Sequence, residues 1–131
     1  MVTALKNAVL VAAVMGLSTT SGGVRAERHE IYEYSQRTLL KNWALSVCLA
    51  KVSKDEWHRE DANASAGAYL EFGRQPIEAY EELRDLASKY AARTYSSSNS
   101  AEAELNTMKC IDLFHSKELN ALARRWVKKH P

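Results

Sequence analysis

Apolar residues recur at offsets of three and four along most of this chain, which is the period of an α-helix with one buried face. The pattern is clearest at Leu40, Trp43, Ala44, Val47 and Cys48, within a helix predicted over residues 31–52. Glycine occurs only 5 times and proline twice in 131 residues, and no alternating pattern indicates a β-hairpin. We therefore predict an all-α fold.

Further helices are predicted over residues 55–72, 76–93 and 101–114 and from Ser116 onward. Asp55 and Ser116 are residue types that cap helix N-termini. Gly73 is expected to end the second helix, and Pro76 to lie near the first turn of the third. The last two helices are either separate or one helix continuous through His115. The predicted architecture is a compact bundle of four to five helices. Residues predicted to face inward are Ala62, Ser65, Ala68, Tyr69 and Phe72, then Tyr80, Leu83, Ala87 and Tyr90, then Leu105, Met108 and Ile111, and last Leu119, Leu122 and Trp126.

Residues 1–26 have the pattern of a secretory signal peptide. Lys6 precedes an apolar run of ten residues, 8–17, which is too short to cross a bilayer as a stable helix. Small and polar residues follow and end in Val24-Arg25-Ala26, a sequence that signal peptidase accepts. The alternative, a buried core helix, would require an amphipathic pattern or a cap. We expect cleavage after Ala26 and a mature domain of residues 27–131 that is exported and has no membrane-embedded segment.

The charge of the mature domain argues against a nucleic-acid partner. The formal charge of +2 comes entirely from Lys6 and Arg25, so that the mature domain has 16 basic and 16 acidic residues. Nucleic-acid binding requires a basic face that neutralises phosphates. The one basic cluster lies at residues 124–130, where cations complement the dipole of a C-terminal helix.

Cys48 and Cys110 both lie in the exported part, where an even pair of cysteines forms a disulfide. Closing a loop of roughly sixty residues stabilises a domain by about 4 kcal/mol on the chain-entropy model. The histidines are scattered without the spacing of a zinc site, so that no metal or other cofactor is expected. They are His29, His58, His115 and His130.

The sequence has no pattern typical of a catalytic site. It lacks a glycine-rich phosphate loop and the G-x-S-x-G, H-E-x-x-H and C-x-x-C motifs. Glu56 and Glu60 have the spacing of a solvated helix face, which is a commoner pattern than an acid/base pair. We predict that the protein is not an enzyme.

Two surface features remain after the core is assigned. The helix over 76–93 has an acidic outer face, and a serine-rich loop follows it. For most proteins such features are a solvated surface and a connector. The residues alone therefore predict a small exported helical domain that binds a partner. The acidic residues are Glu78, Glu81, Glu82 and Asp85, and the loop residues are Tyr95, Ser96, Ser97, Ser98 and Asn99.

The segment Lys109-Cys110-Ile111-Asp112-Leu113-Phe114-His115-Ser116-Lys117-Glu118-Leu119 resembles the C-terminal signature of the type VI secretion amidase immunity proteins. These form the Tai4 family, which includes the Rap-type resistance proteins. Ser46-Val47-Cys48-Leu49-Ala50 resembles the cysteine segment of the family's first helix. Ala92-Arg93-Thr94-Tyr95-Ser96 resembles the end of the family's third helix. The resemblance extends over most of residues 30–128.

The resemblance implies a periplasmic, homodimeric protein that neutralises a cognate amidase of the Tae4 type. Such amidases are papain-like NlpC/P60 enzymes that rival cells inject to cut peptidoglycan stem peptides. Family members occlude the amidase cleft with helix three of one subunit and a loop of the other, so that the acidic face and the serine-rich loop become candidate effector-binding residues. The motif itself is expected to serve the fold, with Asp112 and His115 as internal hydrogen-bonding groups.

Two other functions compete with the immunity function. One is that of a periplasmic acid-stress chaperone, a class that is also small, helical and disulfide-linked. Such a chaperone unfolds and exposes apolar surface at strongly acidic pH. The other is peptidoglycan hydrolysis, which the missing catalytic pattern disfavours.

Overall fold

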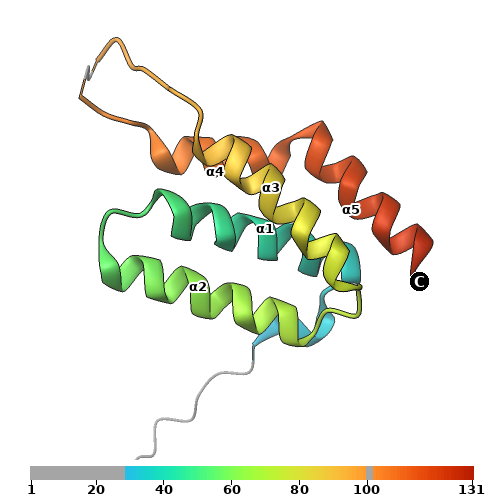
Figure 1. Cartoon of the computed structure of the whole chain (residues 1–131). Helices are drawn as coiled ribbons and strands as arrows, with labels where there is room; N and C mark the ends of the chain where they lie inside the picture. Colours follow the sequence, from blue (N-terminus) through green and yellow to red (C-terminus); the bar gives the residue numbers. More distant parts are fainter. Residues whose placement is uncertain (1–28, 100–101) are drawn as a thin grey trace, which may run out of the picture.

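A computed structural model describes residues 29–99 and 102–131 of the protein. The elements are a short 3-10 helix, η1 (Glu30–Glu33), and five α-helices, α1 (Gln36–Val52), α2 (Glu56–Glu71), α3 (Ile77–Ala91), α4 (Asn106–His115) and α5 (Lys117–Lys129). In Figure 1, α1 lies between α2 on one side and α3, α4 and α5 on the other. The predicted all-α class is confirmed. The predicted signal peptide, residues 1–26, lies outside the described residues.

The core is built around α1, which packs against all four other α-helices. Leu40, Ala44 and Cys48 on α1 are fully buried, as the periodicity predicts. The predicted inward faces of α3 and α5 are also confirmed, except that Leu122 is only half-buried. The buried cluster consists of Leu40, Trp43, Ala44, Cys48, Ala66, Ala79, Tyr80, Leu83, Ala87, Tyr90, Cys110, Leu113, Leu119, Ala123 and Trp126. No helix among residues 29–99 and 102–131 is long and apolar enough to cross a membrane.

The Cys48–Cys110 disulfide is confirmed and ties α1 to α4. The two Cα atoms are 5.6 Å apart, and both side chains are fully buried. The bridge closes a loop that contains α2 and α3, and thereby restricts the conformations of the denatured chain.

The structure corrects the prediction for α4 in its start and in its buried face. The helix begins at Asn106 and not at residue 101, because Leu105 has a left-handed backbone, with φ 50° and ψ 40°, that an α-helix does not accommodate. Met108 and Ile111, predicted to face inward, are each 49% exposed, whereas Cys110 and Leu113 are fully buried. The disulfide turns Cys110 toward α1, and the helical period then turns Met108 outward.

Ser116 separates α4 from α5, which resolves the alternative of one continuous helix. Its backbone is extended, with φ −63° and ψ 146°, and its side chain accepts a hydrogen bond from the backbone N–H of Leu119. The predicted cap of α2 is likewise confirmed, since the Asp55 carboxylate accepts a hydrogen bond from the N–H of His58. On α2, however, Ala68 is exposed where the sequence predicted it inward, and Ala66 is the buried residue.

Gly73 follows the C-terminal end of α2, as predicted. Its φ is not positive. A Cβ atom at this position would overlap the hydroxyl oxygen of Tyr80, which is buried at the start of α3 and forms no hydrogen bond with any described residue. Burial also raises the pKa of the Tyr80 hydroxyl. Gly73 is therefore required by the close approach of the α2–α3 connection to Tyr80.

We expect Gly73→Ala to lower the free energy of unfolding by about 1–3 kcal/mol, because Tyr80 must shift within a packed core. The matched control is Gly67→Ala in the middle of α2, where a Cβ would meet nothing within 4 Å. That change should raise the free energy of unfolding by about 0.5–1 kcal/mol. Urea denaturation measures both. In a Tyr80→Phe background the cost of Gly73→Ala should fall, and an unchanged cost would show that the hydroxyl is not the obstacle.

Candidate functional site

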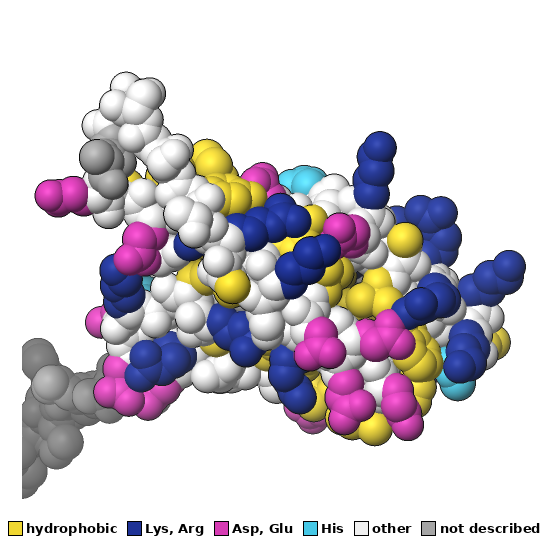
Figure 2. All heavy atoms as spheres, turned by 45° about the horizontal axis from the view of Figure 1, so that its top comes forward, with side chains coloured by type: hydrophobic (Ala, Val, Ile, Leu, Met, Phe, Trp, Pro, Cys, Tyr) yellow, Lys and Arg dark blue, Asp and Glu magenta, His cyan; other side chains and the backbone are white. Residues whose placement is uncertain are grey.

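The acidic face of α3 is exposed, as predicted. The buried stripe of α3 points to α1, and Glu78, Glu81, Glu82 and Asp85 lie on the opposite side of the helix. Figure 2 shows acidic side chains gathered on this part of the surface, with basic side chains beside them. Like charges at these spacings disfavour a helix slightly, which the position of Glu78 in the first turn partly offsets.

Among the residues that the structure describes, only one of these four carboxylates has an ion-pair partner. Glu82 forms an ion pair with Arg125 on α5. A second ion pair joins the same two helices, with Lys89 Nζ 3.1 Å from Glu118 Oε2. Within the described ranges, Glu78, Glu81 and Asp85 have no ion-pair partner. Three carboxylates of α3 are therefore available to a partner protein.

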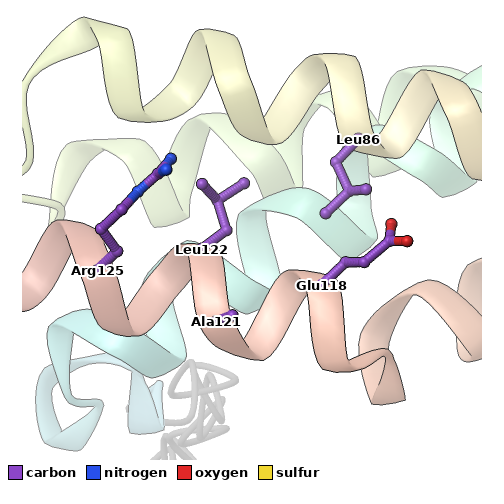
Figure 3. Close-up of a pocket in the computed structure, with 5 residues that line it drawn as sticks. All are labelled: Leu86, Glu118, Ala121, Leu122 and Arg125. Atoms are coloured by element: carbon purple, nitrogen blue, oxygen red, sulfur yellow. The ribbon is translucent and has the colours of Figure 1, made fainter.

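A shallow apolar groove runs between α3 and α5, bounded by these two ion pairs. Figure 3 shows Leu86 and Leu122 pointing into it, with Arg125 at one end and Glu118 at the other. Its volume is about 300 Å³. The groove is next to the acidic face, because Arg125 pairs with Glu82. This part of the surface thus offers an apolar strip as well as carboxylates.

The serine-rich loop extends beyond the bundle where α3 ends (Figure 1). Ser96, Ser98 and Asn99 are exposed, and Tyr95 and Ser97 are half-buried. The backbone N–H of Asn99 donates to Ser97 Oγ, with the two atoms 3.2 Å apart. The exposed hydroxyls and the amide are available as hydrogen-bonding groups for a partner.

Both arms of this loop are held by polar contacts. On the outgoing arm, the Tyr95 hydroxyl donates to Asp112 Oδ2 on α4 at 2.6 Å. On the returning arm, Glu104 accepts hydrogen bonds from Lys54 Nζ at 2.7 Å and from the Asn106 amide at 2.9 Å. The bond from Lys54 is the main cause that lowers the pKa of Glu104. The loop is thereby tied to both the α1–α2 connection and α4.

The roles predicted for the motif residues are partly confirmed. Asp112 is a hydrogen-bonding group, although it lies at the surface and not inside the core. His115 is exposed, its ring meets Phe114 edge-to-face at 5.4 Å, and the ring nitrogens make no hydrogen bond to a described residue. The prediction of an internal role for His115 is therefore wrong. It failed because the last turn of α4 presents His115 to solvent.

The structure does not bring the acidic face and the loop together within one chain. The acidic residues lie in the first and middle turns of α3, from Glu78 to Asp85, and the loop begins at its C-terminal end. With a rise of 1.5 Å per residue, Glu81 and Ala91 are roughly 15 Å apart along the helix. The α3–α5 groove and the pairing of Glu82 were not predicted from the sequence. The strongly amphipathic pattern of α5 could have indicated that another helix covers its apolar face.

The described part of the chain contains no group of three or more His, Cys, Asp or Glu side chains placed to hold a metal ion.

Comparison with known proteins gives consistent matches. The family model Tai4, described as type VI secretion system (T6SS) amidase immunity protein, matches residues 38–123. A chain in the structure of the effector–immunity system Tae4/Tai4 from Salmonella typhimurium is 49% identical, with a TM-score of 0.71, over 76% of this chain and 96% of that chain. A chain in a structure of new type VI-secreted toxins and self-resistance proteins in Serratia marcescens is 31% identical, with a TM-score of 0.69, over 79% and 87%.

A third structure, of the Tae4–Tai4 complex from Enterobacter cloacae, shares the fold, with 23% identity, a TM-score of 0.65 and coverage of 75% and 98%. None of the curated proteins compared with the chain matches it. Because the family model spans most of the helical bundle and the Salmonella chain is 49% identical over nearly its whole length, this chain belongs to the Tai4 family of T6SS amidase immunity proteins, which are not enzymes.

Proposed function

We propose that this protein is exported to the periplasm, binds a cognate type VI secreted peptidoglycan amidase of the Tae4 type, and blocks its active-site cleft. The producing cell and its sister cells are thereby protected. The observation that carries this proposal is the 49% identity to a chain of the Salmonella Tae4/Tai4 effector–immunity system. The signal peptide pattern of residues 1–26 supports export, which leaves residues 27–131 as the immunity domain.

A protein can block a cleft by complementary shape and charge, without a catalytic reaction. The cleft of a papain-like NlpC/P60 amidase is a groove for an extended peptide, which a helix edge or a protruding loop can fill. The free carboxylates Glu78, Glu81 and Asp85 fit an amidase with a basic rim, since complementary charges steer association. The hydroxyls and amide of residues 96–99 fit a polar cleft wall.

We also propose that two copies of the chain act together. The acidic face lies in the first and middle turns of α3 and the loop follows its C-terminal end, so that the two surfaces are separated along the helix within one chain. A homodimer can present the helix of one copy beside the loop of the other. α2 packs almost entirely on α1, and its outer surface carries the small exposed residues Ala64, Gly67 and Ala68, which suit the close approach of a second copy. Sedimentation at micromolar concentration should give a dimer mass, and a monomer mass would contradict this part of the proposal.

The function is tested by inhibition. Purified 27–131 should stop cleavage of peptidoglycan stem peptides by a Tae4-type amidase, with the Salmonella enzyme as the probe, at one immunity chain per amidase chain. Papain serves as the control cleft and should keep its activity. Full amidase activity at excess immunity protein, without detectable binding, would refute the proposal.

Location is tested separately in cells that direct the amidase to their periplasm. The full chain should protect these cells, and a chain lacking residues 1–26 should not, because it remains on the wrong side of the inner membrane. Equal protection by both would contradict periplasmic action while leaving amidase binding intact.

A further inference from the structure

The outgoing arm of the α3–α4 loop is attached to α4 through the side chain of Tyr95. Tyr95 lies four residues beyond the end of α3, and its hydroxyl donates to Asp112 Oδ2 at 2.6 Å. Asp112 lies two residues after Cys110, which the disulfide fixes to α1. The acceptor of this hydrogen bond is therefore held by the most constrained part of the bundle.

Arg93 adds a second contact to the same arm. Its guanidinium carbon lies 3.4 Å from the ring centroid of Tyr90, a buried residue in the last turn of α3. A hydrogen bond to the Tyr95 side chain raises the pKa of Arg93, so that this cation stays charged beside the two tyrosines. Tyr90, Arg93, Tyr95 and Asp112 thus form a continuous chain of contacts from α3 across the loop to α4.

The returning arm is held independently. Glu104 bonds to Lys54, and the Asn106 amide bonds to Glu104 and to the carbonyl oxygen of Val52 at 3.3 Å. Lys109, a buried lysine on α4, donates to Asn106 Oδ1 at 2.8 Å. Because this arm has several contacts and the outgoing arm depends chiefly on Tyr95, the Tyr95–Asp112 bond is the contact whose loss would free one arm alone.

We propose that Tyr95 and Asp112 are positioning residues, whose hydrogen bond holds residues 95–99 in the conformation that enters the amidase cleft. This inference rests on the proposed function. Fixing the backbone of a residue costs conformational entropy. A loop that is already ordered in the free protein loses this entropy on folding and not on binding. More of the free energy of its contacts with the amidase then contributes to affinity. The acceptor is a carboxylate, which makes the bond stronger than one between neutral groups.

The test is a double-mutant cycle read as affinity for the amidase, with Salmonella Tae4 as the probe. Tyr95→Phe and Asp112→Ala should each weaken binding about fivefold to tenfold, the usual effect of one lost hydrogen bond. The double variant should be no weaker than either single variant. Asp112→Asn retains a neutral side-chain oxygen that accepts from the Tyr95 hydroxyl, and should weaken binding less than Asp112→Ala does. Tyr69→Phe, the same chemical change on α2, is the matched control and should have no effect.

Amide hydrogen exchange of the free protein gives an independent readout. Exchange over residues 95–99 should rise in Tyr95→Phe and Asp112→Ala and rise less in Asp112→Asn, with no change in the core helices. If Tyr95→Phe weakens binding while Asp112→Ala does not, or if their effects add, Tyr95 contacts the amidase directly and the positioning role is overturned. Unchanged exchange in both variants would overturn it as well. If the wild-type protein does not bind the amidase, the proposed function fails, and exchange still decides whether this bond holds the loop.

Discussion

The double substitution Glu81→Lys/Asp85→Lys is expected to weaken binding of the cognate amidase by about 10- to 100-fold, because like charges facing each other across an interface cost several kcal/mol. Both carboxylates are exposed on α3, opposite its buried stripe, and have no ion-pair partner in the described ranges. The free energy of unfolding should therefore change by less than about 0.5 kcal/mol. Titration calorimetry measures the affinity, and association rates of the wild type should fall as salt rises.

The choice of residues follows from the structure. Glu82 is left unchanged because its pairing with Arg125 would make Glu82→Lys perturb the α3–α5 contact as well as the acidic face. Glu30→Lys/Glu33→Lys on η1 makes the same change of charge at two exposed positions outside α3, and should leave the affinity near that of wild type. Equal loss in both double variants would mean that net charge matters and not the α3 surface. Unchanged affinity of Glu81→Lys/Asp85→Lys would place the interface elsewhere on the bundle.

Removing the disulfide with Cys48→Ala/Cys110→Ala is expected to lower the free energy of unfolding by about 2–5 kcal/mol. The bridge joins residues 62 positions apart, and both side chains are fully buried between α1 and α4. Its loss frees the denatured chain, and the alanines leave space where the sulfur atoms packed. Urea denaturation of the wild type and the variant measures the difference.

Two further measurements separate the contributions to this effect. Cys48→Ser/Cys110→Ser places two hydroxyl groups in an apolar site, and should be less stable than the alanine variant. Wild-type protein denatured with reductant present should lose a comparable amount of stability, and without reductant it should show no free thiol under denaturing conditions. A reductant-insensitive unfolding curve would show that the bridge does not contribute as expected.

Many features of this protein could be predicted from residues that are near one another in the sequence. The helical period alone predicts the buried faces of α1 and α3, because these helices have one dominant apolar stripe. Asp55 and Ser116 cap helices through their own side chains within three residues, so that no distant contact is needed to predict them. With only two cysteines in the chain, Cys48 has a single possible intramolecular partner. The acidic face of α3 follows from the same period, since it lies opposite the buried stripe.

Tertiary structure decided the features that depend on distant residues. In α4, Met108 and Ile111 form one apolar stripe while Cys110 and Leu113 form another, and only the packing of Cys110 against α1 selects which is buried. Glu82 meets Arg125 across 43 positions, and Tyr95 meets Asp112 across 17, pairings that no local period encodes. The start of α4 likewise depends on tertiary structure, because Leu105 just before it has a left-handed backbone conformation that local preference disfavours.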